Sequence, residues 1–183
     1  MFQLKTALIS ITALALAACG GGGSTSIGVS HTVSSTTTVA YVYDEPALLK
    51  ASVYDSYGDR ASIDDNYVAE IDPYYNRGIF EVNWSVDAPS DYYIEIAFGY
   101  SLFFDQASVV HAEYCGPYEF CDTQGTAICD YTSNLGMRCD VGLAHTDLSR
   151  QIFQLPQSGY LFISACSTDF EYCEYDTIRA KLF

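Results

Sequence analysis

The sequence is poor in basic residues. It has 8 Lys and Arg against 23 Asp and Glu in 183 residues, a formal net charge of -15. Such a charge repels nucleic acid and anionic lipid headgroups, so neither is expected as a partner. Because 49% of the residues are hydrophobic, the acidity does not mark a disordered tail, and the chain can bury a core.

Several functional motifs are also missing. No Gly-x-Ser-x-Gly elbow and no C-x₂-C knuckle occurs, which argues against an α/β-hydrolase and against a structural zinc site. A Ser/His/Asp triad stays open, because its members can come from any part of a fold. The apolar run Ala7–Ala18 is too short to cross roughly 30 Å of hydrocarbon, so a permanent membrane helix is not expected.

The N-terminus carries a recognisable pattern. A short segment with one positive charge, Lys5, precedes the apolar run, which ends in Leu16-Ala17-Ala18-Cys19 before four glycines. This resembles the lipobox leader of bacterial lipoproteins. The resemblance implies cleavage before Cys19, a diacylglyceryl group on its thiol and acylation of its freed amine. Gly20 in place of aspartate implies the outer membrane of a Gram-negative host, with the domain in the periplasm or on the cell surface.

These features predict three parts. Residues 1–18 are a signal peptide, residues 19–38 are the lipidated cysteine and a flexible Gly/Ser/Thr tether, and residues 39–183 are one β-domain. A tether of this composition spans roughly 25 Å. The alternative to lipidation is an ordinary secretory signal cut after Ala18, with Cys19 in a disulfide.

Without Cys19 the cysteines number six, namely Cys115, Cys121, Cys129, Cys139, Cys166 and Cys173. An even number in an exported protein predicts disulfides. Turn residues lie inside each short span, so pairing in sequence order is expected: Cys115–Cys121, Cys129–Cys139 and Cys166–Cys173.

Period-two alternation dominates the rest of the chain. The clearest runs are Phe80–Val86 and Tyr92–Tyr100, which we expect to be an antiparallel pair with their aromatic faces in one core. Trp84 should lie in that core. The last two strands should form a hairpin around the Cys166–Cys173 loop. Weaker strands are expected at Val39–Tyr43, Leu48–Tyr54, Tyr67–Ile71, Ser108–Tyr114, Gln151–Leu155, Tyr160–Ala165 and Tyr175–Phe183.

About nine short strands and no convincing amphipathic helix favour an all-β fold, an antiparallel two-sheet sandwich of jelly-roll or Ig-like type. An eight-stranded barrel is the alternative. The stretch from Leu155 to Ile163, followed by a loop and Tyr175–Leu182, faintly resembles the end of pre-peptidase C-terminal domains, which are small secreted β-sandwiches. That resemblance supports the predicted fold and gives no indication of function.

Acidic residues and tyrosines are the candidate site residues. Four aspartates fall within eleven residues, namely Asp55, Asp59, Asp64 and Asp65. Their carboxylates are the hard oxygen ligands that calcium prefers, but their spacing is not that of an EF-hand. A solvated acidic loop is therefore the main interpretation, and a structural calcium ion is the alternative. No other cofactor is expected. The pairs Tyr74-Tyr75 and Tyr92-Tyr93 should place one ring on each face of a strand. Exposed rings such as Tyr74, Tyr75 and Tyr93 beside carboxylates are typical of glycan and protein-binding surfaces, although tyrosine also tolerates half-burial in a sandwich.

His111-Ala112-Glu113 is similar to the H-x-E of zinc deaminases, but the cysteines that follow lack the required Pro-Cys spacing. We therefore interpret His111 as a polar strand residue. The leading function is a membrane-anchored surface lipoprotein whose non-catalytic domain binds a glycan or a protein partner. The alternatives are a structural envelope lipoprotein without a specific ligand and an exported hydrolase with an unrecognised site.

Overall fold

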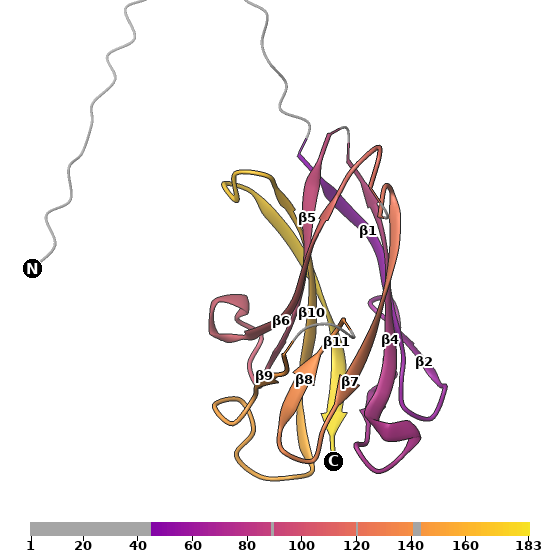
Figure 1. The fold of residues 1–183 in the computed structure, drawn as a ribbon, viewed down its shortest axis with the longest axis vertical. Coiled ribbons are helices and arrows are strands. Elements are labelled where there is room, and N and C mark those ends of the chain that lie inside the picture. The colour runs from indigo at the N-terminus through magenta and orange to yellow at the C-terminus, as the bar shows by residue number, and fades with distance from the viewer. Residues whose placement is uncertain (1–44, 89, 120, 141–143) are drawn as a thin grey trace, which may run out of the picture. The chain divides into compact units, whose positions relative to one another are not determined.

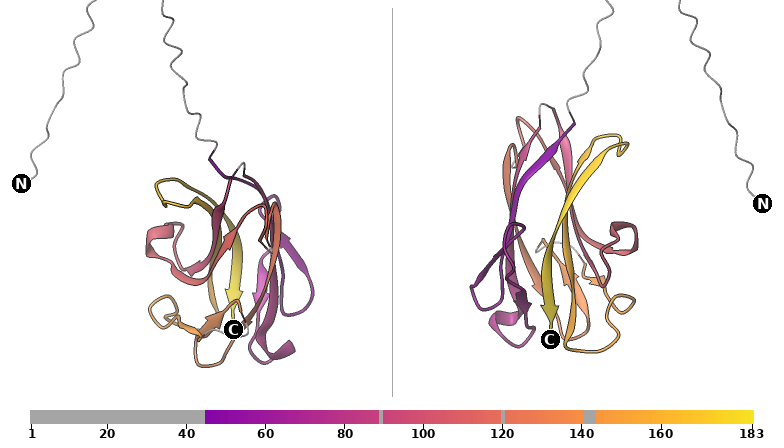
Figure 2. Two further views of the ribbon diagram at one scale, coloured as in Figure 1. Left: turned by 45° about the horizontal axis from the view of Figure 1, so that its top comes forward. Right: turned by 180° about the vertical axis from the view of Figure 1, so that it is seen from behind.

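The computed structural model of the protein describes residues 45–88, 90–119, 121–140 and 144–183, which belong to one compact unit. The leader, Cys19, the tether and the predicted strand Val39–Tyr43 lie outside these residues. Eleven strands in two layers make up most of this part of the chain (Figures 1 and 2). They are β1 (Ala47–Tyr54), β2 (Arg60–Ser62), β3 (Ala69–Ile71), β4 (Ile79–Asp87), β5 (Tyr92–Gly99), β6 (Ser108–Cys115), β7 (Gln124–Tyr131), β8 (Gly136–Arg138), β9 (Thr146–Asp147), β10 (Gln157–Ser167) and β11 (Cys173–Leu182).

The strands form two separate sheets, which confirms the predicted sandwich over the barrel. The first sheet has the order β2-β1-β4-β7-β8-β9, and the second has the order β3-β11-β10-β5-β6. All pairs are antiparallel except β3 with β11. Two short 3₁₀ segments, η1 (Asn76–Gly78) and η2 (Phe104–Gln106), are the helical elements among the described residues. None of the described helices is long and apolar enough to cross a membrane.

The core lies between the sheets and follows from alternation. In β4 the side chains of Phe80, Val82, Trp84 and Val86 are buried while their neighbours are partly exposed. In β5 the inward residues Tyr92, Ile94, Ile96 and Phe98 meet them from the other sheet. Since an inward row on each sheet is apolar, one continuous core is formed.

The expected pairing of these two strands is wrong. β4 pairs with β1 and β7, whereas β5 pairs with β10 and β6. Their apolar faces do share one core, but they reach it from opposite layers, because the connection after Asp87 crosses the sandwich. Periodicity indicates which face of a strand is buried. It does not indicate which other strand pairs with it.

Trp84 is buried as predicted, with 3% of its surface exposed. Its indole lies over Gly125 of β7, where a Cβ atom would come within 2.2 Å of Cζ2. Only glycine leaves room for the indole at this point.

The three predicted disulfides are confirmed. Cys115–Cys121 closes the loop after β6, Cys129–Cys139 joins β7 to the residue after β8, and Cys166–Cys173 closes the β10–β11 hairpin. That hairpin is also confirmed, with pairing from Gln157↔Leu182 to Cys166↔Cys173.

The predicted strand Gln151–Leu155 is wrong. The N–H groups of Gln151 and Ile152 both donate to Leu148 O, which makes a turn. The side chain of Gln151 donates to Gln106 O at 2.8 Å and is buried against the β5–β6 connection. Its burial reflects this loop-to-loop contact and not a place in a sheet.

Candidate functional site

A concave surface lies over the outer face of the first sheet, where three side chains are aligned across neighbouring strands. Tyr54 of β1 pairs with Glu81 of β4, and Glu81 pairs with Ile128 of β7. All three point away from the core, since Val53, Val82 and Ala127 occupy the inward phase. The cavity above this row has a volume of about 610 Å³.

The turn after β1 adds an aromatic wall to this cavity. Asp55 is only 3% exposed, and its carboxylate accepts hydrogen bonds from the N–H groups of Tyr57, Asp59 and Glu70, each at 3.0 Å. Three N–H donors on one carboxylate fix the turn tightly. Tyr57 is thereby held at the rim of the cavity, which it lines.

A second turn places Tyr75 against Tyr57. The carboxylate of Asp72 accepts the N–H of Tyr74 at 2.8 Å and the hydroxyl of Tyr57 at 2.8 Å. The rings of Tyr57 and Tyr75 then stack with centroids 4.3 Å apart and planes 27° apart. The hydrogen bond to Asp72 raises the pKa of Tyr57, so this phenol stays neutral. We call Tyr54, Tyr57, Tyr75 and Glu81 the aromatic groove.

The floor of the aromatic groove continues into a chain of polar side chains. Asn83 donates to Glu81 Oε1 at 2.8 Å, and Thr126 donates to Asn83 Oδ1 at 2.6 Å. Glu81 is therefore held in position by its strand neighbours. The groove combines flat rings, a fixed carboxylate and amide groups, which is the arrangement that binds ligands carrying both apolar faces and hydroxyls.

The predicted tyrosines do not form one surface. Tyr75 lines the aromatic groove, and Tyr74 beside it is 84% exposed. The two lie in a turn, so the expectation that they alternate along a strand is wrong; for Tyr92 and Tyr93 in β5 it is confirmed, with Tyr92 buried and Tyr93 on the outer face. Tyr93 belongs to the second sheet, where its ring packs at 5.2 Å from Tyr114 and 4.9 Å from Phe170.

The four aspartates of the calcium interpretation have separate surroundings. Asp55 fixes the Tyr57 turn, Asp59 accepts the hydroxyl of Tyr67 at 3.0 Å, and Asp65 accepts the N–H and hydroxyl of Ser62. Asp64 is exposed. Within the described residues no three metal-ligating side chains converge. The hydrogen bond from Ser62 lowers the pKa of Asp65. This carboxylate therefore binds groups of its own loop.

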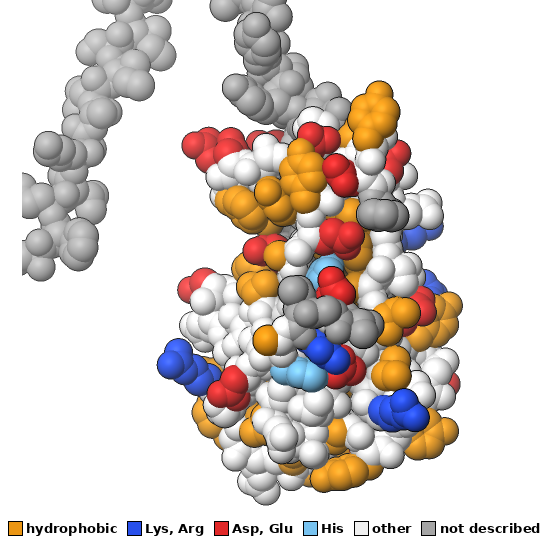
Figure 3. All heavy atoms as spheres, viewed as in Figure 1, with side chains coloured by type: hydrophobic (Ala, Val, Ile, Leu, Met, Phe, Trp, Pro, Cys, Tyr) orange, Lys and Arg blue, Asp and Glu red, His pale blue; other side chains and the backbone are white. Residues whose placement is uncertain are grey.

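The described residues contain two histidine–carboxylate pairs, and the sequence analysis missed the one formed by His145 and Asp130. His145 Nε2 lies 2.5 Å from Asp130 Oδ2, and Arg138 Nε donates to Asp130 Oδ1 at 2.7 Å. Burial opposes ionisation of Asp130, but the hydrogen bonds from Arg138 and His145 outweigh it and lower its pKa. Figure 3 shows histidine side chains on the same face as acidic and apolar groups. In the described part of the chain no serine hydroxyl bonds either histidine, so a Ser/His/Asp triad is not assembled there.

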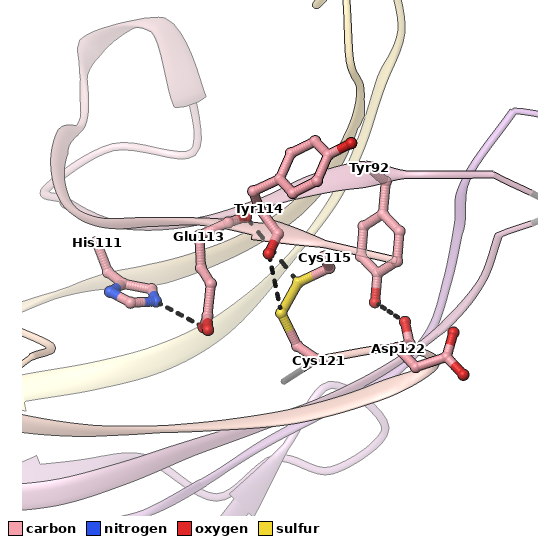
Figure 4. The surroundings of a disulfide bond; sticks show 7 residues. All are labelled: Tyr92, His111, Glu113, Tyr114, Cys115, Cys121 and Asp122. Atoms are coloured by element: carbon pink, nitrogen blue, oxygen red, sulfur yellow. Dashed lines mark hydrogen bonds and ion pairs between the residues drawn. A yellow bond between two sulfur atoms is a disulfide. The ribbon is translucent and has the colours of Figure 1, made fainter. Parts of the chain in front are cut away.

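The second pair is His111 and Glu113 on β6, with 3.3 Å between Nε2 and Oε2 (Figure 4). His111 is a strand residue as expected, but it is buried. The register passes from Ile96↔His111 to Ala97↔Val109, so Val110 is an extra residue in β6. This β-bulge turns both Val110 and His111 inward, and a bulge leaves no signature in the spacing of apolar residues.

Comparison with known proteins gives no relative from which a function could be transferred. No family model, no curated protein and no solved structure matches the chain.

Proposed function

We propose that this chain is a lipid-anchored envelope protein whose β-sandwich is a non-catalytic module that binds a neutral glycan in the aromatic groove. The observation that supports this most is the stacked pair Tyr57–Tyr75 beside the fixed carboxylate of Glu81, above one concave surface. A pyranose ring offers an apolar C–H face to such rings and hydroxyl donors to such a carboxylate. Rings that are already ordered lose little freedom on binding.

Charge limits the ligand. Glu81 lines the groove, and the carboxylate of Asp72 accepts the hydroxyl of Tyr57 in its wall. The whole chain has a formal net charge of -15. Uronic acids, sulfated sugars and phosphorylated glycans would be repelled by these carboxylates. Neutral hexose polymers are therefore the preferred class.

A protein partner is the second candidate, and its surface would be different. The rings of Tyr93, Tyr114 and Phe170 form a separate cluster at the second sheet and do not line the groove. The hydroxyl of Tyr114 donates to Asp91 at 2.5 Å. No cavity is found over this set of rings in the described residues, which suits a flat protein surface better than a sugar chain. The concave groove favours the glycan.

Attachment to the envelope is the second half of the proposal. Lipidation of Cys19 and an outer-membrane location are supported by the leader sequence alone. Cys19→Ala should abolish labelling by a palmitate analogue and release the protein from the membrane fraction. Normal labelling and membrane recovery of that variant would contradict the anchor and leave the glycan site untouched.

The glycan site is tested by array screening with the mature, disulfide-intact protein. Tyr75→Ala should weaken binding of any neutral hit by about 1–2 kcal/mol, or roughly 5- to 30-fold in Kd, because a stacking ring is lost. Tyr118→Ala is the matched control, since Tyr118 is fully exposed on the Cys115–Cys121 loop away from the groove. Equal weakening by both variants would contradict the proposal.

A further inference from the structure

On one side of the sandwich, two strand edges have no paired neighbour in the part of the chain that the structure describes. β6 is the outermost strand of its sheet. β8 pairs with β7 only at Asp130 and Tyr131, so in the described residues the upper part of β7, Gln124–Cys129, has β4 as its only partner. Thr146 covers the beginning of β6 by donating to Val109 O at 3.1 Å, and no described strand pairs with the rest of that edge. Open strand edges present backbone N–H and C=O groups to an added strand.

A cavity of about 280 Å³ lies between these two edges. His111, Ala112 and Glu113 of β6 line one wall, and Thr126, Ala127 and Ile128 of β7 line the other. Cys139 and Asp140 complete it. In Figure 4 the side chains of His111 and Glu113 leave β6 in the same direction. A strand that paired with β6 would place one of its side chains at this cavity.

The imidazole of His111 determines which chemical group the cavity can accommodate. The residue is 8% exposed, and its Nε2 faces the Glu113 carboxylate. A carboxylate is an acceptor, so in the neutral imidazole Nε2 carries the proton and Nδ1 is left as an acceptor. Nδ1 is buried and has no hydrogen-bond partner among the described residues. Native proteins rarely leave a buried acceptor unpaired, which indicates that a donor from outside belongs here.

We propose that an extended peptide adds to the free edge of β6 and inserts an arginine side chain into this cavity. A guanidinium group has several N–H donors, so one can satisfy His111 Nδ1 while its charge pairs with Glu113. The acidic surface of the chain favours approach of a basic segment. Backbone pairing supplies affinity, and the cavity selects the side chain. This site is separate from the aromatic groove.

The test uses three blocked pentapeptides and the mature protein. The first is Thr-Val-Arg-Val-Thr, the second has methionine in place of arginine, and the third is the arginine peptide with both valines N-methylated. Calorimetry should give at least tenfold weaker binding for the second and third peptides. Hydrogen exchange should show that the first protects amides in Ala112–Tyr114.

Glu113→Gln should weaken the arginine peptide at least tenfold. Glu119→Gln is the matched control, because Glu119 is an exposed carboxylate on the adjoining loop that does not line the cavity. Equal binding of the arginine and methionine peptides, no protection of β6, or equal effects of the two variants would each overturn the proposal. Glycan binding should be the same in Glu113→Gln and wild type, which separates this test from that of the groove.

Discussion

Replacing Gly125 by alanine should destabilise the domain. Alanine at an ordinary strand position stabilises by about 0.5–1 kcal/mol, because glycine loses more backbone freedom on folding. Here the added Cβ would lie 2.2 Å from Trp84 Cζ2, 2.4 Å from Cε2 and 2.7 Å from Nε1. The rigid indole is packed in the core, so it has to shift as a whole. Overpacking of this kind costs about 1–3 kcal/mol, and we expect a net loss in that range for Gly125→Ala.

The assay is guanidinium unfolding followed by the fluorescence of Trp84, the only tryptophan. The native emission should be blue-shifted and poorly quenched by acrylamide, as befits a buried indole. Trp84→Ala should cost about 3–5 kcal/mol. Far-UV circular dichroism of Gly125→Ala in a Trp84→Leu background checks the contact, because removing the indole should remove the penalty. A neutral or stabilising Gly125→Ala in the wild-type background would refute the reasoning.

Three further predictions concern stability and covalent structure. Asp55→Ala should lower the free energy of unfolding by about 2–3 kcal/mol, because it leaves three backbone N–H groups without their acceptor. Chemical denaturation measures this loss, and a loss smaller than that of Asp64→Ala would contradict the prediction. Burial raises the pKa of Tyr92 and of Tyr131 to about 12 from 10.0, so the stability they contribute is complete below pH 10 and is lost as pH rises through about 12. At pH 7, Tyr92→Phe should cost about 1 kcal/mol, because its hydrogen bond to Asp122 O is lost. Tyr131→Phe should be close to neutral, because that hydroxyl has no partner among the described residues, and equal losses would count against this assignment. Non-reducing peptide mapping should recover Cys115–Cys121, Cys129–Cys139 and Cys166–Cys173 alone, and any link between the first four cysteines and the last two would contradict the pairing.

Alternation along the chain was sufficient to predict most of the long strands. β4, β5 and β10 carry large apolar side chains on one phase, so their existence and buried faces could be read directly. β7 was missed because its inward residues include Gly125, Ala127 and Cys129, which are small. They are small for a reason that lies outside β7: the indole of Trp84 covers Gly125, and Cys129 is in a disulfide. Long-range packing of this kind leaves no local pattern.

The candidate site was only partly predictable. Tyr75 was named from the sequence, but Tyr54, Tyr57 and Glu81 join it through register and two turns that are set by Asp55 and Asp72. Asp55 was assigned to a solvated acidic loop, with calcium as the alternative, yet in the fold it is buried and its carboxylate accepts hydrogen bonds from three N–H groups. A carboxylate that shapes a turn and one that faces a cation look the same in a sequence.

The central claim is that the aromatic groove binds a neutral glycan. Its most direct test is calorimetry with cellohexaose, maltohexaose and chitohexaose against wild type, Tyr75→Ala and Tyr118→Ala, with thermal unfolding to verify that each variant is folded. The account predicts that at least one of these sugars binds, that Tyr75→Ala weakens it roughly 5- to 30-fold, and that Tyr118→Ala binds as wild type. Binding that survives Tyr75→Ala unchanged, or the absence of binding to all three sugars, would contradict it.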